Sequence, residues 1–157
     1  MFGILLALAG FQVAVTLREH DERRSKYQEA VAYCKTAGKL LLVVGGPYGG
    51  VSWMKAHGCG DVCLDINPWA CRGCETVVAD IREIPFPDGK FGAAYVSHIL
   101  EHLPTIEDAR RAVGELYRVS DKVFVCGPGK LNLHAWLMRE HHLWVKQDND
   151  TIWVQQR

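Results

Sequence analysis

The chain has 157 residues, a length typical of one domain rather than two. Its 18 basic and 18 acidic residues give a net charge of zero, so we expect no nucleic-acid partner, because affinity for phosphates comes mainly from clustered lysine and arginine. An apolar fraction of 48% and 15 glycines exclude a disordered chain and a coiled coil. Six cysteines are too few at this length for a secreted disulfide scaffold, which favours reduced thiols and a cytoplasmic protein.

The N-terminal segment 2–17 (FGILLALAGFQVAVTL) carries no charge and one strongly polar residue, Gln12. A helix of this length measures about 25 Å, close to the minimum for crossing a bilayer. A signal peptide is disfavoured because no basic residue precedes the segment. We expect residues 1–19 to form a hydrophobic helix that is either a membrane anchor or a buried or self-associating helix. An anchor would leave residues 20–157 at the cytoplasmic face, because basic residues follow it: Arg18, Arg23, Arg24 and Lys26.

The rest of the chain alternates between predicted helices and predicted strands. An amphipathic helix over 20–37, ending at Gly38, is predicted by apolar residues at helical spacing: Tyr27, Ala30, Val31 and Cys34. Short apolar runs predict five buried strands, at 39–44, 61–65, 76–80, 91–97 and 122–126. A short helical stretch is expected before about His57, a helix capped by Thr105, another over about 132–142, and a hairpin from 143–146 and 151–154.

This alternation predicts an α/β fold with a parallel sheet and right-handed crossovers. We expect a Rossmann-like, seven-stranded, mostly parallel sheet with a minimal set of helices, to which the C-terminal hairpin adds an antiparallel strand. Only about ten residues join 65 to 76 and 80 to 91, near the minimum for a crossover. The third strand should therefore be an exposed edge. An apolar patch is expected there, and it favours a homo-oligomer: Val62, Leu64, Val77 and Trp69.

Glycines and acids lie where a sheet of this kind binds its ligand, at the carboxyl ends of the strands. The turn after the first strand contains Gly45, Gly46 and Gly49, which let the backbone approach a ligand closely. Asp65 ends the second strand, where a carboxylate can accept both hydroxyls of a ribose. Asp80 ends the third strand, where a carboxylate can face the amine of an adenine. Each acid alone could equally be a strand-end cap, but the three features together describe an adenosine pocket.

The most specific motifs of the chain are residues 78–91 (VADIREIPFPDGKF), 97–104 (SHILEHLP) and 115–119 (ELYRV). In order and spacing they are similar to the segments GDAEDLPFPDGSFD, SxVLEHL and ExxRVLKPG of the class I S-adenosylmethionine-dependent methyltransferases of the small-molecule, methyltransferase-11-like type. The resemblance covers residues 39 to about 130. It implies the Rossmann-like fold and S-adenosylmethionine as cofactor.

The resemblance also implies roles for individual residues. Gly45, Gly46 and Gly49 would lie beneath the methionine moiety. Asp65 with Ile66 would contact the ribose, Asp80 with Ile81 the adenine, and Ser97 with His98 would end the cofactor floor. The chain departs from the family pattern at three places: Val43, where an acid is usual, Pro47, where a glycine is usual, and the segment between 65 and 76, which is too short for the usual helix. A weakened or lost cofactor site therefore stays open.

The candidate catalytic residues are histidines. Methyl transfer requires positioning, exclusion of water and, for a protic acceptor, a base. His98 and His102 leave the fourth strand towards the substrate side and can act as a base near neutral pH, although His102 could equally be a packing or capping residue. Three further histidines could line the other rim of the site, but the pattern favours their facing water: His134, His141 and His142.

Four cysteines fall within sixteen residues: Cys59, Cys63, Cys71 and Cys74. The spacing of the last two is a good half-site for zinc. We nevertheless expect no metal, because Cys63 lies inside a predicted buried strand and buried free cysteine is a common small hydrophobe. Unlinked thiols are the favoured interpretation, with zinc and a disulfide as the alternatives.

Together these features predict transfer of a methyl group from S-adenosylmethionine to a small-molecule or lipid-soluble acceptor. The alternative is a catalytically degenerate methyltransferase fold that acts as a binding or scaffold module, as Val43 and Pro47 suggest. A third possibility is an adenosine-pocket protein with other chemistry. The expected partners are the acceptor, a second copy of the chain and, through residues 2–17, a membrane, whereas the identity of the acceptor does not follow from the fold.

Overall fold

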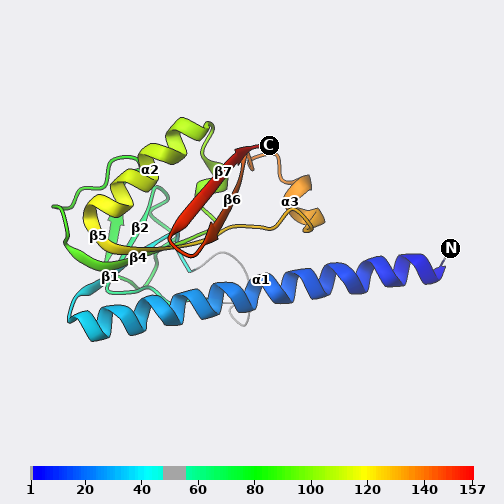
Figure 1. The fold of residues 1–157 in the computed structure, drawn as a ribbon, viewed down its shortest axis with the longest axis horizontal. Helices are drawn as coiled ribbons and strands as arrows, with labels where there is room; N and C mark the ends of the chain where they lie inside the picture. The colour runs from blue at the N-terminus through cyan, green and yellow to red at the C-terminus, as the bar shows by residue number, and fades with distance from the viewer. Residues whose placement is uncertain (1, 48–55) are drawn as a thin grey trace.

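The structure, a computed structural model, describes residues 2–47 and 56–157. Its body is a sheet between two helices, and the N-terminal helix extends well beyond it (Figure 1). The sheet runs in the order β3-β2-β1-β4-β5, with parallel pairing throughout. Its strands are β1 (Leu40–Val44), β2 (Val62–Asp65), β3 (Thr76–Val78), β4 (Phe91–Ser97) and β5 (Ser120–Cys126). The predicted α/β, Rossmann-like fold with a mostly parallel sheet and few helices is confirmed.

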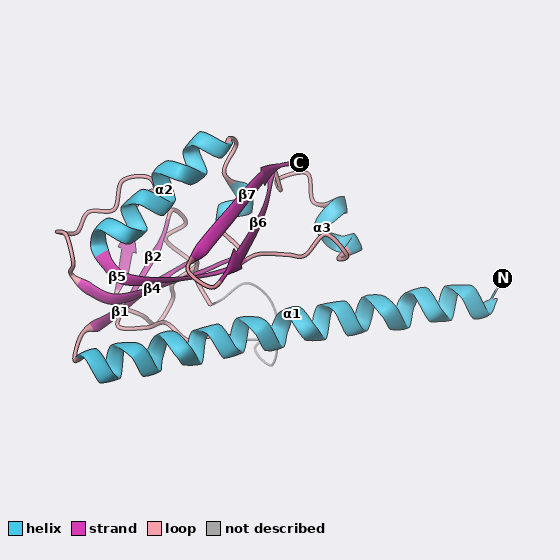
Figure 2. Ribbon diagram, in the orientation of Figure 1, coloured by secondary structure: helices cyan, strands magenta, loops and turns pink. Residues whose placement is uncertain are grey.

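Helix α1 (Phe2–Ala37) covers one face of the sheet with its C-terminal half (Figure 2). Ala30 and Cys34, from the predicted apolar stripe, are buried there against β1, β4 and β5. Polar contacts also hold the helix in place, because Tyr95 Oη donates to the backbone oxygen of Arg23 at 3.0 Å. The helix runs unbroken through residue 19, where the sequence predicted the end of a separate hydrophobic helix.

The opposite face is covered by α2 (Ile106–Val119). As predicted, Thr105 caps this helix, since its Oγ1 accepts a hydrogen bond from the backbone N–H of Asp108 at 3.0 Å. The buried stripe Ala109, Ala112 and Leu116 packs on the large core cluster of the sheet. The sheet is therefore buried on both faces, which explains why its strands are nearly continuous apolar runs.

The connections between strands are short. In the described chain no helix joins β2 to β3 or β3 to β4, as expected from the sequence. A single turn of 3-10 helix, η2 (Leu100–His102), follows β4. Helix α3 (Leu133–Leu137) is much shorter than the predicted helix over 132–142. Tertiary contacts hold the following loop in another conformation, because Arg157 Nη1 donates to the backbone oxygen of Met138 at 2.7 Å and the His142 N–H donates to that of Glu101 at 2.7 Å.

The predicted C-terminal hairpin is present as β6 (Leu143–Asp148) and β7 (Thr151–Gln156), but it forms its own two-stranded sheet. The main sheet therefore has five strands rather than the predicted seven. A side chain of the hairpin explains the difference. Gln147 Oε1 accepts from the Val125 N–H at 2.7 Å, and its Nε2 donates to the Val123 oxygen at 2.8 Å, so the edge of β5 is occupied by an amide side chain instead of a strand.

Four cysteines form two disulfides, Cys59–Cys74 and Cys63–Cys71, which corrects the prediction of unlinked, reduced thiols. The β2–β3 connection folds back beside β2 and brings the Cα atoms of the pairs to 5.7 and 5.8 Å, a separation that a disulfide requires. Cys34 and Cys126 are free and buried, and burial raises the pKa of Cys126 to about 11. Disulfides persist mainly in oxidising environments, whereas the cysteine count had favoured a cytoplasmic location.

The N-terminal half of α1 lies outside the core. Its exposed apolar side chains are Ile4, Leu5, Leu6, Leu8, Phe11, Val13 and Leu17. Two polar residues connect it to the body, since Gln12 Nε2 donates to the Leu131 oxygen at 3.1 Å and Glu19 Oε1 accepts from the Gly129 N–H at 2.7 Å. Within residues 2–47 and 56–157, no helix has the length and apolar character needed to span a membrane.

Strand β3 is an edge of the sheet, as predicted. The apolar patch at this edge differs in composition from the expected one. Val62 and Leu64 are buried in the core, whereas the side chains exposed near the edge are Ile66, Trp69 and Val78. The reason is that the β3–β4 connection covers this part of the sheet without forming a helix, because its residues Ile81 and Ile84 pack in the same core cluster as Val62 and Leu64.

Candidate active site

A cavity of about 360 Å³ lies at the carboxyl ends of β1, β2, β3 and β4. Four of its lining residues, Asp65, Ile66, Asp80 and Ile81, are those that the sequence analysis assigned to the ribose and the adenine. The others are Val44, Leu64, Ala79, Arg82, Ile99, His102, Leu103 and Pro104. Mostly apolar walls with a few polar groups, at this edge of a parallel sheet, are typical of a small-molecule site.

Asp65 joins the turns that follow β1 and β2. Its Oδ2 accepts from the Gly46 N–H at 3.0 Å, and its Oδ1 accepts from the Asn67 N–H at 2.8 Å. An ionised carboxylate has about four acceptor positions, so each oxygen can still accept a ligand hydroxyl. The residue therefore acts as a strand-end cap and also presents a carboxylate to the cavity.

Asp80 is held by the side chain two residues along the chain. The Arg82 backbone N–H and Nε donate to Oδ1 at 2.8 and 3.0 Å, and Arg82 Nη2 donates to Oδ2 at 2.6 Å. Arg82 Nη1 also donates to Asp108 Oδ1 at 2.8 Å, which ties this wall of the cavity to the first turn of α2. The hydrogen bonds from Arg82 lower the pKa of Asp80, so this carboxylate is ionised at neutral pH.

The glycine turn after β1 is tightly enclosed. Gly45 has φ +93°, and a Cβ at this position would lie 2.7 Å from Ile99 Cγ1 and 2.8 Å from the Ser97 oxygen. A Cβ on Gly46 would overlap the backbone carbonyl of Ala70. Both positions therefore require glycine for close packing of the protein on itself. Gly49, and the helical stretch expected before His57, fall on residues 48–55, outside the described residues.

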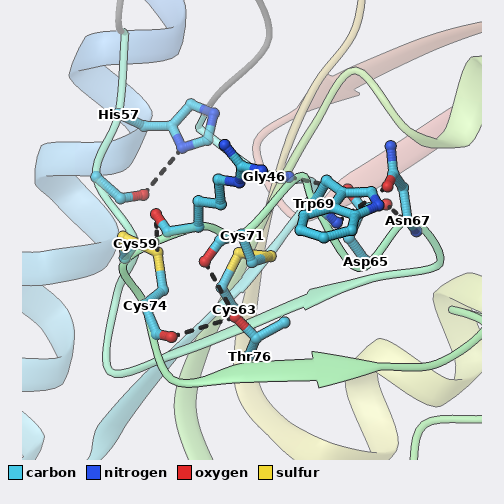
Figure 3. The surroundings of a disulfide bond; sticks show 12 residues. Gly46, His57, Cys59, Cys63, Asp65, Asn67, Trp69, Cys71, Cys74 and Thr76 are labelled. Atoms are coloured by element: carbon cyan, nitrogen blue, oxygen red, sulfur yellow. Dashed lines mark hydrogen bonds between the residues drawn. A yellow bond between two sulfur atoms is a disulfide. The ribbon is translucent and has the colours of Figure 1, made fainter.

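The loop that covers Gly46 is the one held by the two disulfides (Figure 3). Cys63–Cys71 fastens the loop to β2, and Cys59–Cys74 fastens its end to the segment before β2. Thr76 Oγ1 donates to the Cys71 oxygen at 3.0 Å, which closes the loop against β3. The disulfides thus replace the missing helix as the support of the strand-end acid Asp65.

Ser97 does not lie at the cavity. Alternate residues of β4 face opposite sides, and Ser97 shares the α1 side with Tyr95. Its Oγ is within hydrogen-bond distance of Arg23 Nε on α1, at 3.0 Å. The two acids and their isoleucines line the cavity, whereas Gly45, Gly46 and Ser97 are not among its lining residues, and their assigned contacts with a cofactor stay predictions.

The histidines that follow β4 lie beside a buried acid. His102 lines the cavity, and its Nδ1 lies 3.2 Å from the backbone oxygen of Glu140. His98, with φ +55°, places Nδ1 3.1 Å from Glu101 Oε1. The ring of His141, from the loop after α3, stands 4.8 Å from the ring of His102 in an edge-on arrangement. The segment is thus a cluster of three imidazoles around one carboxylate, next to the cavity.

Sequence reasoning missed Glu101 and placed His141 at a rim or in water. Glu101 is fully buried, and His141 is 9% exposed. The EH pair at 101–102 was visible as part of a family motif, but nothing local marks His141, which follows 39 residues after His102. Arg82 was also missed, although its place two residues after Asp80 allows the pairing that the structure shows.

Two comparisons of the sequence with known proteins both find methyltransferases. Residues 46–122 match the family described as "Methyltransferase domain". The chain is 32% identical over 83 residues to "Probable tRNA methyltransferase 9B" of Mus musculus and 33% identical over 122 residues to the protein of that name from Bos taurus. These alignments cover 52% and 74% of this chain but only 17% and 26% of the relatives. A crystal structure of the PH0226 protein from Pyrococcus horikoshii OT3 aligns with 80% of this chain and 63% of its own, at TM-score 0.48 and 17% identity.

Proposed function

Because the chain belongs to the class I S-adenosylmethionine-dependent methyltransferases, we propose that it transfers a methyl group from S-adenosylmethionine to a small-molecule acceptor. One observation carries the proposal. Two carboxylates, Asp65 and Asp80, line a single cavity at neighbouring strand ends, within the region that matches the family.

The residues of the cavity fit the adenosyl part of this cofactor. Asp65 would hold the ribose hydroxyls, since its oxygens keep free acceptor positions after binding two backbone amides. Asp80 would face the adenine amine, and Ile66 and Ile81 supply apolar surface for the base. Nothing in the described residues provides an equally clear place for the methionine part, because the amide of Gly46 is directed at Asp65 and its other side is covered by Ala70.

The cofactor supplies a methyl group that is already activated on a sulfonium centre. The protein must therefore orient the acceptor, exclude water and accept a proton where the acceptor is protic. His102 is the histidine that lines the cavity, and with its Nδ1 directed at the Glu140 oxygen its Nε2 can accept a proton. His98 is the second candidate, and its Nδ1 lies 3.1 Å from Oε1 of Glu101.

The acceptor is proposed to be a small or lipid-soluble molecule because the chain has zero net charge. The names of the two mammalian relatives favour tRNA as a second candidate. The two candidate acceptors can be distinguished by how binding and methylation depend on salt concentration. A tRNA acceptor requires binding that weakens steeply with salt, whereas methylation of a neutral small molecule depends little on ionic strength.

The central test is titration calorimetry of the full chain with S-adenosylmethionine and with S-adenosylhomocysteine. We expect Asp65→Ala to weaken binding of both by roughly 5- to 150-fold, which corresponds to about 1–3 kcal/mol for the loss of a half-buried hydrogen-bond partner. The matched control is Asp21→Ala, which removes an exposed acid from α1 and should leave the affinity unchanged.

Two results would contradict the proposal. The first is that the native chain and the Asp65→Ala variant bind both compounds equally well while their melting temperatures show that both are folded. The ligand would then bind elsewhere. Failure of the native chain to bind either compound would favour the alternative, a degenerate methyltransferase fold that serves as a binding module, for which Pro47 in the glycine turn is the motivating residue.

A further inference from the structure

The side chains of Glu101, His102 and His141 converge beside the cavity. Each offers one ligand atom, and these atoms all lie within 4.8 Å of one another. They come from two segments of the chain: η2 supplies the first two, and the loop between α3 and β6 supplies the third. Residues 101 and 141 are held together by the main chain, since the His142 N–H donates to the Glu101 oxygen at 2.7 Å. The cluster is therefore a fixed feature of the fold.

Two of these groups are buried without hydrogen-bond partners. Glu101 is 0% exposed, and neither Oε1 nor Oε2 has a hydrogen-bond partner among the described residues. His98 Nδ1 is close, at 3.1 Å from Oε1, but the two groups are not aligned for a hydrogen bond. The Nδ1 of His141 is likewise buried and unpartnered within the described chain. Burying such groups without hydrogen bonds is unfavourable, so an acid and an imidazole that both lack hydrogen-bond partners at one point call for a ligand.

From this arrangement we infer that Glu101, His102 and His141 form a binding site for a divalent transition-metal ion such as Zn²⁺. Two imidazoles and one carboxylate are a ligand set of catalytic zinc sites, in which a fourth position stays open. A tetrahedral ion with bonds of about 2.0–2.2 Å needs donor atoms roughly 3.4 Å apart, so the ligand atoms must approach one another by at most about 1.4 Å. Rotation of the imidazoles and of the glutamate side chain supplies a movement of this size.

The surroundings of His102 support this assignment. Metal-bound histidines usually donate their other ring N–H to a carbonyl or carboxylate, which fixes the tautomer. His102 Nδ1 lies 3.2 Å from the Glu140 oxygen, which leaves Nε2 as the ligand atom. With the ion bound, His98 rather than His102 is the candidate base. Because His102 also lines the cavity, the ion would lie at its wall. The open position could then bind an oxygen or nitrogen of the acceptor and lower its pKa, a role that rests on the proposed function, whereas metal binding does not.

The experiment is a calorimetric titration of the full, oxidised chain with Zn²⁺ alone, followed by metal analysis after dialysis. We expect one bound ion per chain. Glu101→Gln and His141→Ala should each weaken binding by at least about tenfold, and the matched control His134→Ala, an exposed histidine on α3, should not change it. Thermal melting without metal shows which variants fold. If Glu101→Gln does not fold, His141→Ala, whose side chain comes from a loop, still tests the site.

Cobalt substitution provides a second readout. Co²⁺ bound by two histidines and a glutamate should give visible absorption bands without a sulfur charge-transfer band, and His141→Ala should abolish them. A sulfur band would assign the metal to cysteines and overturn the inference, as would the absence of stoichiometric Zn²⁺ binding or its persistence in both variants. No methyl transfer is needed for any of these measurements, so failure of the metal site and failure of the methyltransferase proposal are distinguishable.

Discussion

His57 shows how burial of one polar residue affects the whole domain. Its ring is packed between Tyr27 of α1 and Tyr95 of β4, with centroid distances of 6.0 and 5.1 Å. Burial lowers the pKa of His57 to about 4, and its Nδ1 lies 3.0 Å from the Gly58 oxygen. The imidazole is thus neutral in the folded protein and supports the contact between α1 and the sheet.

This residue should make stability depend on pH. The unfolded chain binds a proton at His57 below about pH 6.5, but the folded chain does so only near pH 4, so acidification favours unfolding in that interval. The group alone should lower the free energy of unfolding by roughly 2–3 kcal/mol between pH 7 and pH 4. In the His57→Phe variant, the free energy of unfolding, measured with urea at pH 7 and at pH 4, should decrease less between the two pH values than in the native chain. An equal decrease in variant and native chain would mean that His57 is accessible to water.

At the scale of elements, the disulfides take the place of a helix. The β2–β3 connection is too short for the usual crossover helix, and Cys63–Cys71 and Cys59–Cys74 hold it over the glycine turn instead. Chain-entropy estimates for closed loops of 8 and 15 residues are about 2–3 kcal/mol each. The support for Asp65 therefore depends on the oxidation state of the protein.

We expect the double variant Cys63→Ser, Cys71→Ser to lose roughly 2–3 kcal/mol of unfolding free energy and to bind S-adenosylhomocysteine more weakly, because the loop that positions Asp65 is released. Thiol counting on the unfolded, unreduced native chain should find two free thiols, those of Cys34 and Cys126. Six reactive thiols would show that the disulfides do not form. Cys34→Ala is the control, since this cysteine takes no part in the loop.

For the whole molecule, two apolar surfaces are left uncovered within the described chain: the N-terminal half of α1 and the β3 edge. Trp69 is 66% and Val78 is 56% exposed, and α1 packs on β1, β4 and β5 rather than on β3. Exposed apolar edges of this kind are commonly covered by a second copy of the chain. We propose that the protein self-associates through the β3 edge.

Sedimentation or light scattering of the full chain in mild detergent should detect a dimer or larger species. Trp69→Asp combined with Val78→Lys should shift it to monomer, whereas Trp153→Asp, which changes an equally exposed tryptophan on β7, should not. Deletion of residues 1–19 should leave the domain folded. If the deletion of residues 1–19 is enough to abolish association, the contact belongs to α1 instead of the β3 edge. A native chain that is strictly monomeric would contradict the proposal of self-association.

Local patterns in the sequence predict the strands of the sheet, the cap of α2 and the pair of acids that line the cavity. A strand that is buried on both faces has to be an apolar run, so the local pattern is sufficient to locate it. Acids at the carboxyl ends of neighbouring parallel strands lie at the same edge of the sheet, so their position in the sequence is sufficient to bring them together. Three other features are visible only in the folded chain: which cysteines pair, that Gln147 keeps the hairpin out of the main sheet, and that His141 meets Glu101 and His102. Each of these depends on contacts between segments distant along the chain, and no local period records such contacts.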